Sequence, residues 1–432
     1  MSIPVIITLT IVLLFSLLLG GMWVFSALGV AGVLGLFLMG VNLGGAISYQ
    51  LWGSSNSFEL TAIPLFIFMG EIMIQSGMSK GLYSGVSKWV GSFPGGLIHT
   101  NVVACALFAA ISGSSVATAA AIGTVAIPDQ EARGYDKKLI LGSIAASGTL
   151  GILIPPSIIM ILYGSWMEVS VARLFAAGFI PGIIISVFFM LYIAIKCLRQ
   201  PKLAPRLKSF SLREKLLSFK EIWPGVLIIT FILVAIFGGL MTPSETAAVS
   251  VALVLLLATL LRSFSWRLLY KCAINTLHTA TMILIIYVSA KILVMSLMYL
   301  GLTSSIPRFV NSLGLTPIST LLVIYVIYLI LGCFFDGTSL LLVTLPIVQP
   351  LVANIGVDLV WFGVVATILI EVGMITPPVG LNLYVITGIS DATLSETIKG
   401  ILPFFLILLA CLALFTISPQ LVTWLPDLLF GG

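Results

Sequence analysis

Long continuous apolar runs dominate the chain, and polar residues interrupt them at only a few places. Runs that approach or reach the roughly 20 residues needed to cross about 30 Å of hydrocarbon include Ile3–Leu19, Met22–Leu43, Pro224–Leu240 and Ala247–Leu261. The alternation of apolar and polar positions that is typical of half-buried strands is absent, so the pattern predicts membrane-spanning helices. The first run follows no Lys or Arg and contains no small-residue cleavage site, which favours a first span over a removable signal peptide.

Two of the hydrophobic segments are broken by a Gly and a Pro-Pro pair. These segments read GILIPPS at 151–157 and GMITPPVG at 373–380. Proline inside a helix removes a backbone hydrogen bond and costs roughly 3 kcal/mol or more. In lipid, the freed carbonyl groups find no water, so such a break persists where it lines a cavity or binds a ligand. We therefore predict that both breaks belong to a functional site.

The chain is predicted to contain two copies of one unit. Ile3–Leu19 aligns with Trp223–Gly239, and Thr61–Met78 aligns with Thr281–Met298. Each unit is expected to hold three spans, a short amphipathic stretch, a polar-interrupted segment, a broken helix and a closing span. The predicted parts are a first repeat at 1–199 with a hairpin at about 96–128 and a broken helix at about 137–165, a basic linker at 200–221, and a second repeat at 222–432 with a hairpin at about 317–350 and a broken helix at about 359–388.

The polar interruptions predict two re-entrant hairpins. They read SGSS at Ser112–Ser115 and DGTS at Asp336–Ser339, and the apolar segments on either side of each are too short or too interrupted to count as separate full spans. The alternative is two ordinary crossings in each half, which would leave the polar tips at a membrane face.

Composition and charge placement support a membrane protein with inverted halves. Hydrophobic residues make up 60% of the chain, above the roughly 45–50% of soluble domains. If the hairpins are re-entrant, all of the 20 Lys and Arg residues except Arg173, Lys291 and Arg308 fall on one side. The positive-inside rule makes that side, with the basic linker, cytoplasmic. The first hairpin then opens to the cytoplasm, the second opens to the periplasm, and both termini are periplasmic.

The sequence excludes several kinds of chemistry. The five cysteines occur singly and without metal-ligand spacing, and His99 and His278 are isolated. No phosphate-binding loop of the G-x-x-x-x-G-K-[ST] type occurs, so ATP hydrolysis by that route is excluded. Without a nucleophile–base pair or metal-ligand set, we expect neither an enzyme nor a nucleic-acid partner.

The breaks and tips are suited to bind ions. Unwound backbone at each break leaves carbonyl oxygens free, and the tips add hydroxyl groups, a combination that suits a small hard cation such as sodium. The half-helices predicted to begin at Ser157 and Val379 direct N-terminal dipoles toward the breaks, which favours an anion by up to about 2 kcal/mol. Asn382, one turn further, is placed to add a hydrogen bond.

Four ionisable residues fall inside apolar segments. Glu71 and Lys291 occupy corresponding positions in the two halves, and an ion pair between them is one hypothesis. Glu371 precedes the second break and Asp336 lies at the second tip, so both are expected near the site, either as ligands or as hydrogen-bonded neutral groups.

Several segments together resemble a known transporter family. They are SFELTAIPLFIFMGEIM at 57–73, SGSSVATAAAIGTVAIP at 112–128, GILIPPS at 151–157, LFAAGFIPG at 174–182, TPSETAAV at 242–249 and GMITPPVGLNLYV at 373–385. The chain resembles the large membrane subunit (M subunit) of the tripartite ATP-independent periplasmic (TRAP) transporters, within the wider ion-transporter superfamily. One position departs from the family pattern P-x-M-x-x-x-G-Y, because Gln130 stands where the pattern has Met.

The resemblance implies an all-α polytopic inner-membrane protein that imports an organic acid with sodium by an elevator motion. It also implies two partners, a soluble periplasmic substrate-binding protein (P subunit) and a small four-helix membrane subunit (Q subunit). Sialic acids, C4-dicarboxylates, other sugar acids and keto acids all remain open as substrates. The alternative is a stand-alone sodium–anion symporter of a sister family. Carried over by position, the sodium ligands are Ser112, Gly113, Ser115, Gly151, Ile154, Pro156, Gly337, Thr338, Gly373, Thr376 and Pro378. The predicted substrate residues, which follow from the tips and the helix starts and not from the resemblance, are Ser114, Ser157, Asp336, Val379 and Asn382.

Overall fold

The fold is known from a computed structural model that describes residues 3–205 and 210–431. Throughout these residues the chain is helical and contains no strand, which confirms the predicted all-α class. Residues 206–209 of the predicted linker lie outside the described residues. Within residues 3–205 and 210–431, six helices are long and apolar enough to cross a membrane, or up to eight if each of two bent helix pairs is one span.

The first half contains ten α-helices and three short 3-10 helices within the described residues. Their bounds are α1 Ile3–Leu19, α2 Val24–Leu38, α3 Leu43–Ser55, η1 Glu59–Thr61, α4 Ala62–Gln75, α5 Met78–Val90, α6 Leu97–Ser112, α7 Ser115–Ala132, α8 Lys137–Thr149, η2 Leu150–Ile152, α9 Ile158–Met167, α10 Val171–Arg199 and η3 Pro201–Leu203.

The second half repeats the helix order of the first. The helices of the second half are α11 Leu212–Phe237, α12 Pro243–Leu260, α13 Trp266–Tyr299, α14 Leu302–Ser312, α15 Pro317–Gly332, α16 Gly337–Ile355, α17 Leu359–Met374, α18 Leu381–Gly388, α19 Leu394–Ile417 and α20 Gln420–Phe430. The series α5 to α10 thus corresponds to α14 to α19. One difference is that α3 and α4 meet at a bend of 60°, whereas the corresponding α13 is continuous.

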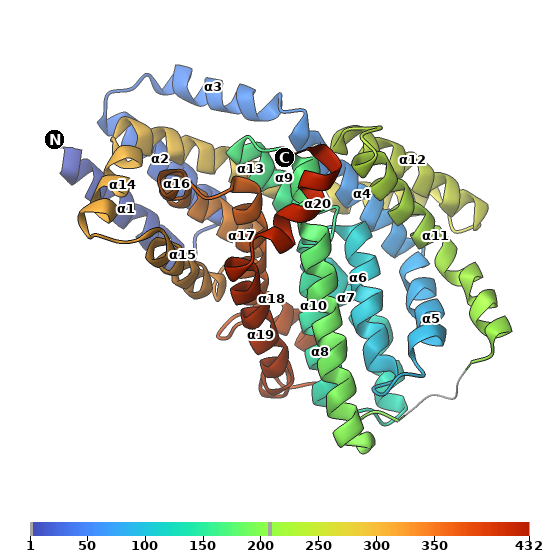
Figure 1. The fold of residues 1–432 in the computed structure, drawn as a ribbon. Helices are drawn as coiled ribbons and strands as arrows, with labels where there is room; N and C mark the ends of the chain where they lie inside the picture. The colour runs from blue at the N-terminus through green and yellow to red at the C-terminus, as the bar shows by residue number, and fades with distance from the viewer. Residues whose placement is uncertain (1–2, 206–209, 432) are drawn as a thin grey trace.

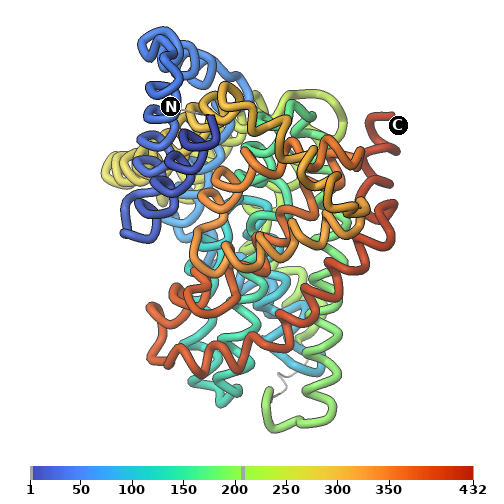
Figure 2. Tube along the Cα trace, turned by 90° about the vertical axis from the view of Figure 1, so that its left-hand side faces the viewer, coloured from blue at the N-terminus to red at the C-terminus, as the bar shows by residue number. Residues whose placement is uncertain are grey.

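The helices form a central group with flanking groups on two sides (Figure 1). In this view α6 to α8, α10 and α17 to α19 lie in the middle, α1, α2 and α14 to α16 lie on the left, and α4, α5, α11 and α12 lie on the right. We call α6 to α10 and α15 to α19, which contact one another, the central group, and α1, α2, α4, α5 and α11 to α13 the flanking helices. Contacts of α13 with α2, α4 and α16 connect these groups. Figure 2 shows that the two ends of the chain lie toward the same end of the molecule, opposite the C-terminal end of α10.

Polar residues at the interruptions start the helices that surround the site. Ser114, Asp136, Ser157, Asp336 and Asp358 are N-caps whose side chains each accept a hydrogen bond from a backbone N–H in the first helical turn. Such caps satisfy donors that the helix itself leaves free. The residues that end one apolar segment therefore also fix where the next helix begins.

Glycine contacts bring helices of the central group close together. At the crossing of α15 and α17, a Cβ added to Gly373 would lie 2.7 Å from the Cα atom of Gly332. Gly142 of α8 similarly faces Gly400 of α19, so a helix of the first half packs on one of the second. Small residues at such crossings let helix backbones approach closely in a membrane.

The outer faces carry large exposed apolar side chains. Val187 and Leu191 on α10, Val326 on α15, and Leu402 and Leu406 on α19 are each more than half exposed. A surface of this kind on helices of spanning length is suited to lipid.

Candidate functional site

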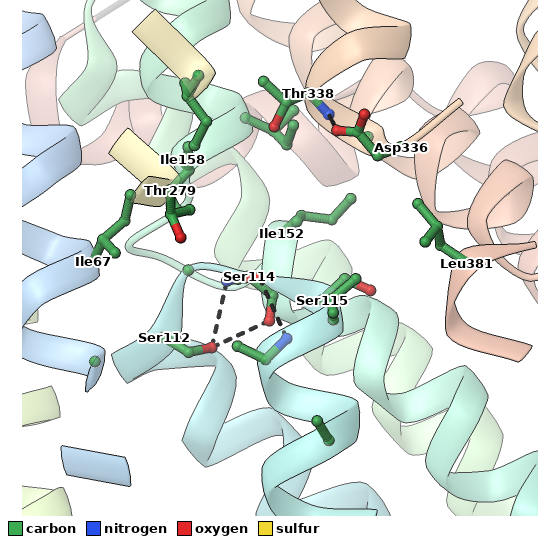
Figure 3. Close-up of a pocket in the computed structure, with 18 of the residues that line it drawn as sticks. Ile67, Ser112, Ser114, Ser115, Ile152, Ile158, Thr279, Asp336, Thr338 and Leu381 are labelled. Carbon is green, nitrogen blue, oxygen red and sulfur yellow. Dashed lines mark hydrogen bonds between the residues drawn. The ribbon is translucent and has the colours of Figure 1, made fainter. Parts of the chain in front are cut away.

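A cavity of about 390 Å³ lies where the two polar interruptions approach one another. Figure 3 shows the Ser112–Ser115 tip below and the tip with Asp336 and Thr338 above it. Helices α4 and α13 close another side. The polar lining residues are Glu71, Ser112, Ser114, Ser115, Thr279, Asp336 and Thr338.

The first tip is held by its own hydroxyl groups. The Oγ atom of Ser112 lies 2.7 Å from Oγ1 of Thr118, which donates to the Ser114 carbonyl oxygen at 2.8 Å. Gly113 has a φ of 60°, in the left-handed region that favours glycine. Thr118 was not among the predicted site residues, although a hydroxyl one turn beyond Ser114 on the same helix face is a signal for it.

The first break is buried directly behind this tip. A Cβ on Gly151 would lie 2.5 Å from the Ser114 carbonyl oxygen, and the Gly113 carbonyl accepts a hydrogen bond from Ile158 N–H at 3.5 Å. Within the described chain, no donor reaches the carbonyl oxygens of Ile154 or Pro156. Helix α9 begins with Ser157 as its N-cap, as predicted, but Ser157 is buried and does not line the cavity.

The second tip is organised by Asp336. Its carboxylate accepts hydrogen bonds from the Thr338 N–H at 3.0 Å and the Ser339 N–H at 3.2 Å, and so caps α16. Asp336, Gly337 and Thr338 all line the cavity. The tip therefore presents the N-terminal end of a 19-residue helix.

The second break is less enclosed than the first. Pro378 is exposed and Val379 is half-buried, and neither lines the cavity. Thr376 donates its hydroxyl to the Val372 carbonyl oxygen at 2.5 Å. The half-helix after this break begins at Leu381, with Gly380 as N-cap at a φ of 51°, so the predicted start at Val379 is wrong. Glycine at 380 lets the chain continue in a left-handed turn before the helix can start.

Only part of the second predicted set of sodium ligands therefore lines the cavity. Gly337 and Thr338 line the cavity, whereas Gly373 packs on Gly332. No donor in the described chain reaches the carbonyl oxygens of Thr376 or Pro378.

Asn382 connects the two halves instead of lining the cavity. Its Nδ2 atom donates to the Ser115 Oγ at 2.7 Å and to the Ala145 carbonyl oxygen at 3.2 Å. All of its side chain is buried. Asn382 thus holds α18 against α7 and α8, and it is not among the residues that line the cavity.

The hypothesis of a Glu71–Lys291 ion pair is wrong. Glu71 accepts a hydrogen bond from Asn275 Nδ2 at 3.0 Å, and Lys291 Nζ lies 4.2 Å from the ring centroid of Trp166. Glu371 is fully buried and does not line the cavity, and neither of its carboxyl oxygens has a hydrogen-bond partner among the described residues. Sequence offset identified equivalent positions, but helix packing gave each residue a different neighbour.

Gln130 forms a buried network at the base of the first helix pair. Its amide nitrogen donates to the Tyr83 hydroxyl at 2.8 Å and to the Leu97 carbonyl oxygen at 3.2 Å. Its side chain also pairs with Asn101, which in turn donates to the Ser143 Oγ at 2.9 Å. The residue that departs from the family pattern therefore joins α5, α6, α7 and α8.

Comparison with known proteins places these features in a family context. Residues 11–421 match the family model described as "Tripartite ATP-independent periplasmic transporter, DctM component". The C4-dicarboxylate TRAP transporter large permease protein DctM of Pseudomonas aeruginosa is 35% identical over 402 residues, which cover 93% of this chain and 94% of that protein. The sialic acid TRAP transporter large permease protein SiaM of Vibrio cholerae is 30% identical over 383 residues, which cover 88% and 89%.

A solved structure shares the fold. The Alcanivorax borkumensis YdaH transporter superposes with a TM-score of 0.60 at 15% sequence identity, over 88% of each chain. At this identity the similarity concerns the helical architecture alone.

Proposed function

Because the chain belongs to the DctM component family of tripartite ATP-independent periplasmic transporters, we propose that it is the transport subunit of a sodium-driven, binding-protein-dependent organic-acid importer. Its relatives are named as permeases, so it is a transporter of the bacterial inner membrane and not an enzyme. The observation that carries the proposal is the single cavity shared by polar tips from both halves.

Sodium binding is supported by the oxygen atoms around the first tip. Hydroxyl groups of Ser112 and Ser115 lie beside a break whose Ile154 and Pro156 carbonyl oxygens have no described donor. Hard cations of this size prefer such neutral oxygen ligands in broken helices. We propose the first set of residues as one sodium site. We propose a second sodium site with Gly337, Thr338, Gly373, Thr376 and Pro378. In this site the carbonyl oxygens of the second break would reach the ion from the side of the tip that faces away from the cavity.

Carboxylate binding is supported by helix ends at the tips. Helix α7 begins at the first tip and α16 at the second, so both N-terminal ends adjoin the cavity. Helix N-termini favour anions through free N–H groups and the helix dipole. The relatives named above are transporters of C4-dicarboxylates and sialic acid, which both carry carboxylates. We propose an organic acid as substrate, bound between Ser114 and Thr338.

An elevator motion is supported by the position of the cavity. One wall consists of the tips, which belong to the central group of helices, and another consists of Glu71 and Thr279 from the flanking α4 and α13. We propose that the two halves are inverted repeats and that their central helices move together as one body. A slide of this central group against the flanking helices would carry the cavity across the membrane. Partners in this proposal are a periplasmic binding protein and a small four-helix membrane subunit.

The proposal is tested by uptake into proteoliposomes that contain this chain and a small membrane subunit, with a periplasmic binding protein added outside. Uptake of the acid that the binding protein retains should require sodium and should stop when the binding protein is omitted. Concentrating a solute a thousandfold requires about 4 kcal/mol, while one net charge crossing 100 mV supplies about 2.3 kcal/mol. Uptake with two or more sodium ions per monoanion should therefore carry current. Unchanged uptake in sodium-free buffer with a proton gradient would contradict sodium coupling, and uptake without the binding protein would favour the stand-alone symporter.

A further inference from the structure

A second cavity, of about 810 Å³, lies between α3, α9, α13 and α16. It shares no lining residue with the central cavity. Its lining includes Lys291 and Glu168 together with hydroxyl groups of Ser54, Ser57 and Ser165. A cavity with this number of polar groups is suited to a polar ligand.

The ammonium group of Lys291 is fixed by aromatic rings. Its Nζ atom lies 4.2 Å from the Trp166 ring centroid and 5.5 Å from that of Tyr287. The two rings meet edge to face at 5.6 Å, and Trp166 Nε1 donates to Gln349 Oε1 at 3.0 Å. None of the ion pairs in the described part of the chain includes Lys291. Its ammonium group is therefore held by the rings without an ion pair, and Glu168 is the carboxylate near enough to act on its charge.

The position of Lys291 along α13 places the cavity at one membrane face. Lys271 lies near the start of the same helix, close in sequence to Arg262 and Arg267, and all three are expected on the cytoplasmic side. Lys291 lies 20 positions after Lys271, which is about 30 Å along the helix, the thickness of the hydrocarbon core. Lys291 thus lies near the opposite, extracytoplasmic face.

The two charges of the cavity define the kind of ligand. Lys291 suits one carboxylate, whereas Glu168 disfavours a second carboxylate and accepts hydrogen bonds from hydroxyl groups. We propose that this cavity is an extracytoplasmic binding site for organic acids that combine one carboxylate with several hydroxyl groups. The choice of an organic acid rests on the proposed function, while the site itself rests on Lys291, Glu168 and their neighbours.

Binding of radiolabelled D-gluconate, a hydroxylated monocarboxylate, tests this site. The full chain is placed in phosphatidylcholine nanodiscs, which contain no anionic headgroup, in sodium-free buffer. Lys291→Met should weaken gluconate binding at least about tenfold, which corresponds to 1.4 kcal/mol. Lys271→Met, the same substitution on the same helix, should leave binding unchanged. Lys291→Arg should retain most of the affinity because it keeps the charge and the stacking.

Glu168→Gln tests the selectivity for hydroxylated monocarboxylates. In the unsubstituted chain gluconate should bind more tightly than succinate, and Glu168→Gln should reduce or reverse that preference because the second carboxylate of succinate is no longer repelled. Equal binding of succinate and gluconate by the unsubstituted chain would overturn the proposed ligand class.

A variant with a blocked central cavity separates this proposal from the proposed function. Gly337→Trp should stop sodium-dependent uptake and retain gluconate binding at the second cavity. Loss of gluconate binding in Gly337→Trp, no saturable binding by the unsubstituted chain, or equal affinity in Lys291→Met would overturn the second site. Sodium-independent uptake would contradict the proposed function and leave the gluconate result standing.

Discussion

The amide nitrogen of Asn382 lies 2.7 Å from the hydroxyl oxygen of Ser115, although the two residues belong to opposite halves of the chain. This contact joins the half-helix after the second break to the tip of the first helix pair. Both side chains are buried, so the hydrogen bond is shielded from water. The two halves are therefore coupled at the tip that we propose to bind sodium.

Removing this contact should impair transport and stability together. Asn382→Ala leaves the Ala145 carbonyl without a side-chain donor as well, and an unsatisfied buried group costs about 1–3 kcal/mol. We expect Asn382→Ala to lower thermal stability and uptake more than Ser115→Ala. The two substitutions should also be non-additive in a double-mutant cycle, since they share one hydrogen bond. Strictly additive effects would show that the two residues act independently.

The glycines of the two tips should tolerate alanine differently. Gly113 has a positive φ, and its added Cβ would lie 3.0 Å from the Pro156 carbonyl oxygen, so Gly113→Ala is expected to reduce uptake severely. Gly337 lacks a positive φ, and its added Cβ would lie 2.9 Å from Cγ2 of Ile370. Because a side chain shifts more easily than backbone, Gly337→Ala should be milder, whereas a bulky residue there should abolish uptake.

Gly388→Ala is the matched control for these variants, because no atom lies within 4 Å of its added Cβ. It should transport at the rate of the unsubstituted protein. Equal uptake by Gly113→Ala and Gly388→Ala would contradict the role given to the first tip.

The buried network around Gln130 should stabilise the base of the first helix pair. Gln130→Met restores the residue of the family pattern but removes both hydrogen bonds between Gln130 and Asn101, and leaving such buried amide atoms unsatisfied costs about 1–3 kcal/mol. We therefore expect a lower melting temperature in detergent for Gln130→Met. The double variant with Gln130→Met and Asn101→Leu should lose less stability than the sum of the losses in the two single variants. Gln420→Met, at an exposed position, serves as control, and an equal melting temperature for the two Gln→Met variants would refute the network.

Alternating access should be visible as a change in thiol labelling at the first tip. Ser114 lines the cavity and is half-buried, whereas four of the native cysteines are buried and only Cys333 is half-buried. After Cys333→Ala, the additional Ser114→Cys should react with a membrane-impermeant reagent from the cytoplasmic side. Sodium and substrate should change the labelling rate, because ligands shift a conformational equilibrium through their differential affinity for its states.

Arg267→Cys, an exposed position at the start of α13, provides the reference for this experiment. Its labelling should be the same under all conditions. If Ser114→Cys behaves like Arg267→Cys with and without sodium, the coupled motion is not supported.

Sequence by itself determined the helical elements and the location of the polar interruptions. The run Ile3–Leu19 coincides with α1, and Ser157 and Asp336 cap the helices that follow them. These features depend on neighbouring residues, because the length of an apolar run, a cap or a Pro-Pro pair acts within one or two turns of helix.

Only the tertiary structure decided which of these elements meet. Ser115, at the edge of the cavity, accepts a hydrogen bond from Asn382 of the other half, Glu71 pairs with Asn275, and Lys291 lies on Trp166. Periodicity and spacing do not encode such contacts, because they depend on how helices distant in sequence pack against one another. The sequence therefore identified the residues able to carry the chemistry, and the packing of the two halves decided which of them face the cavity.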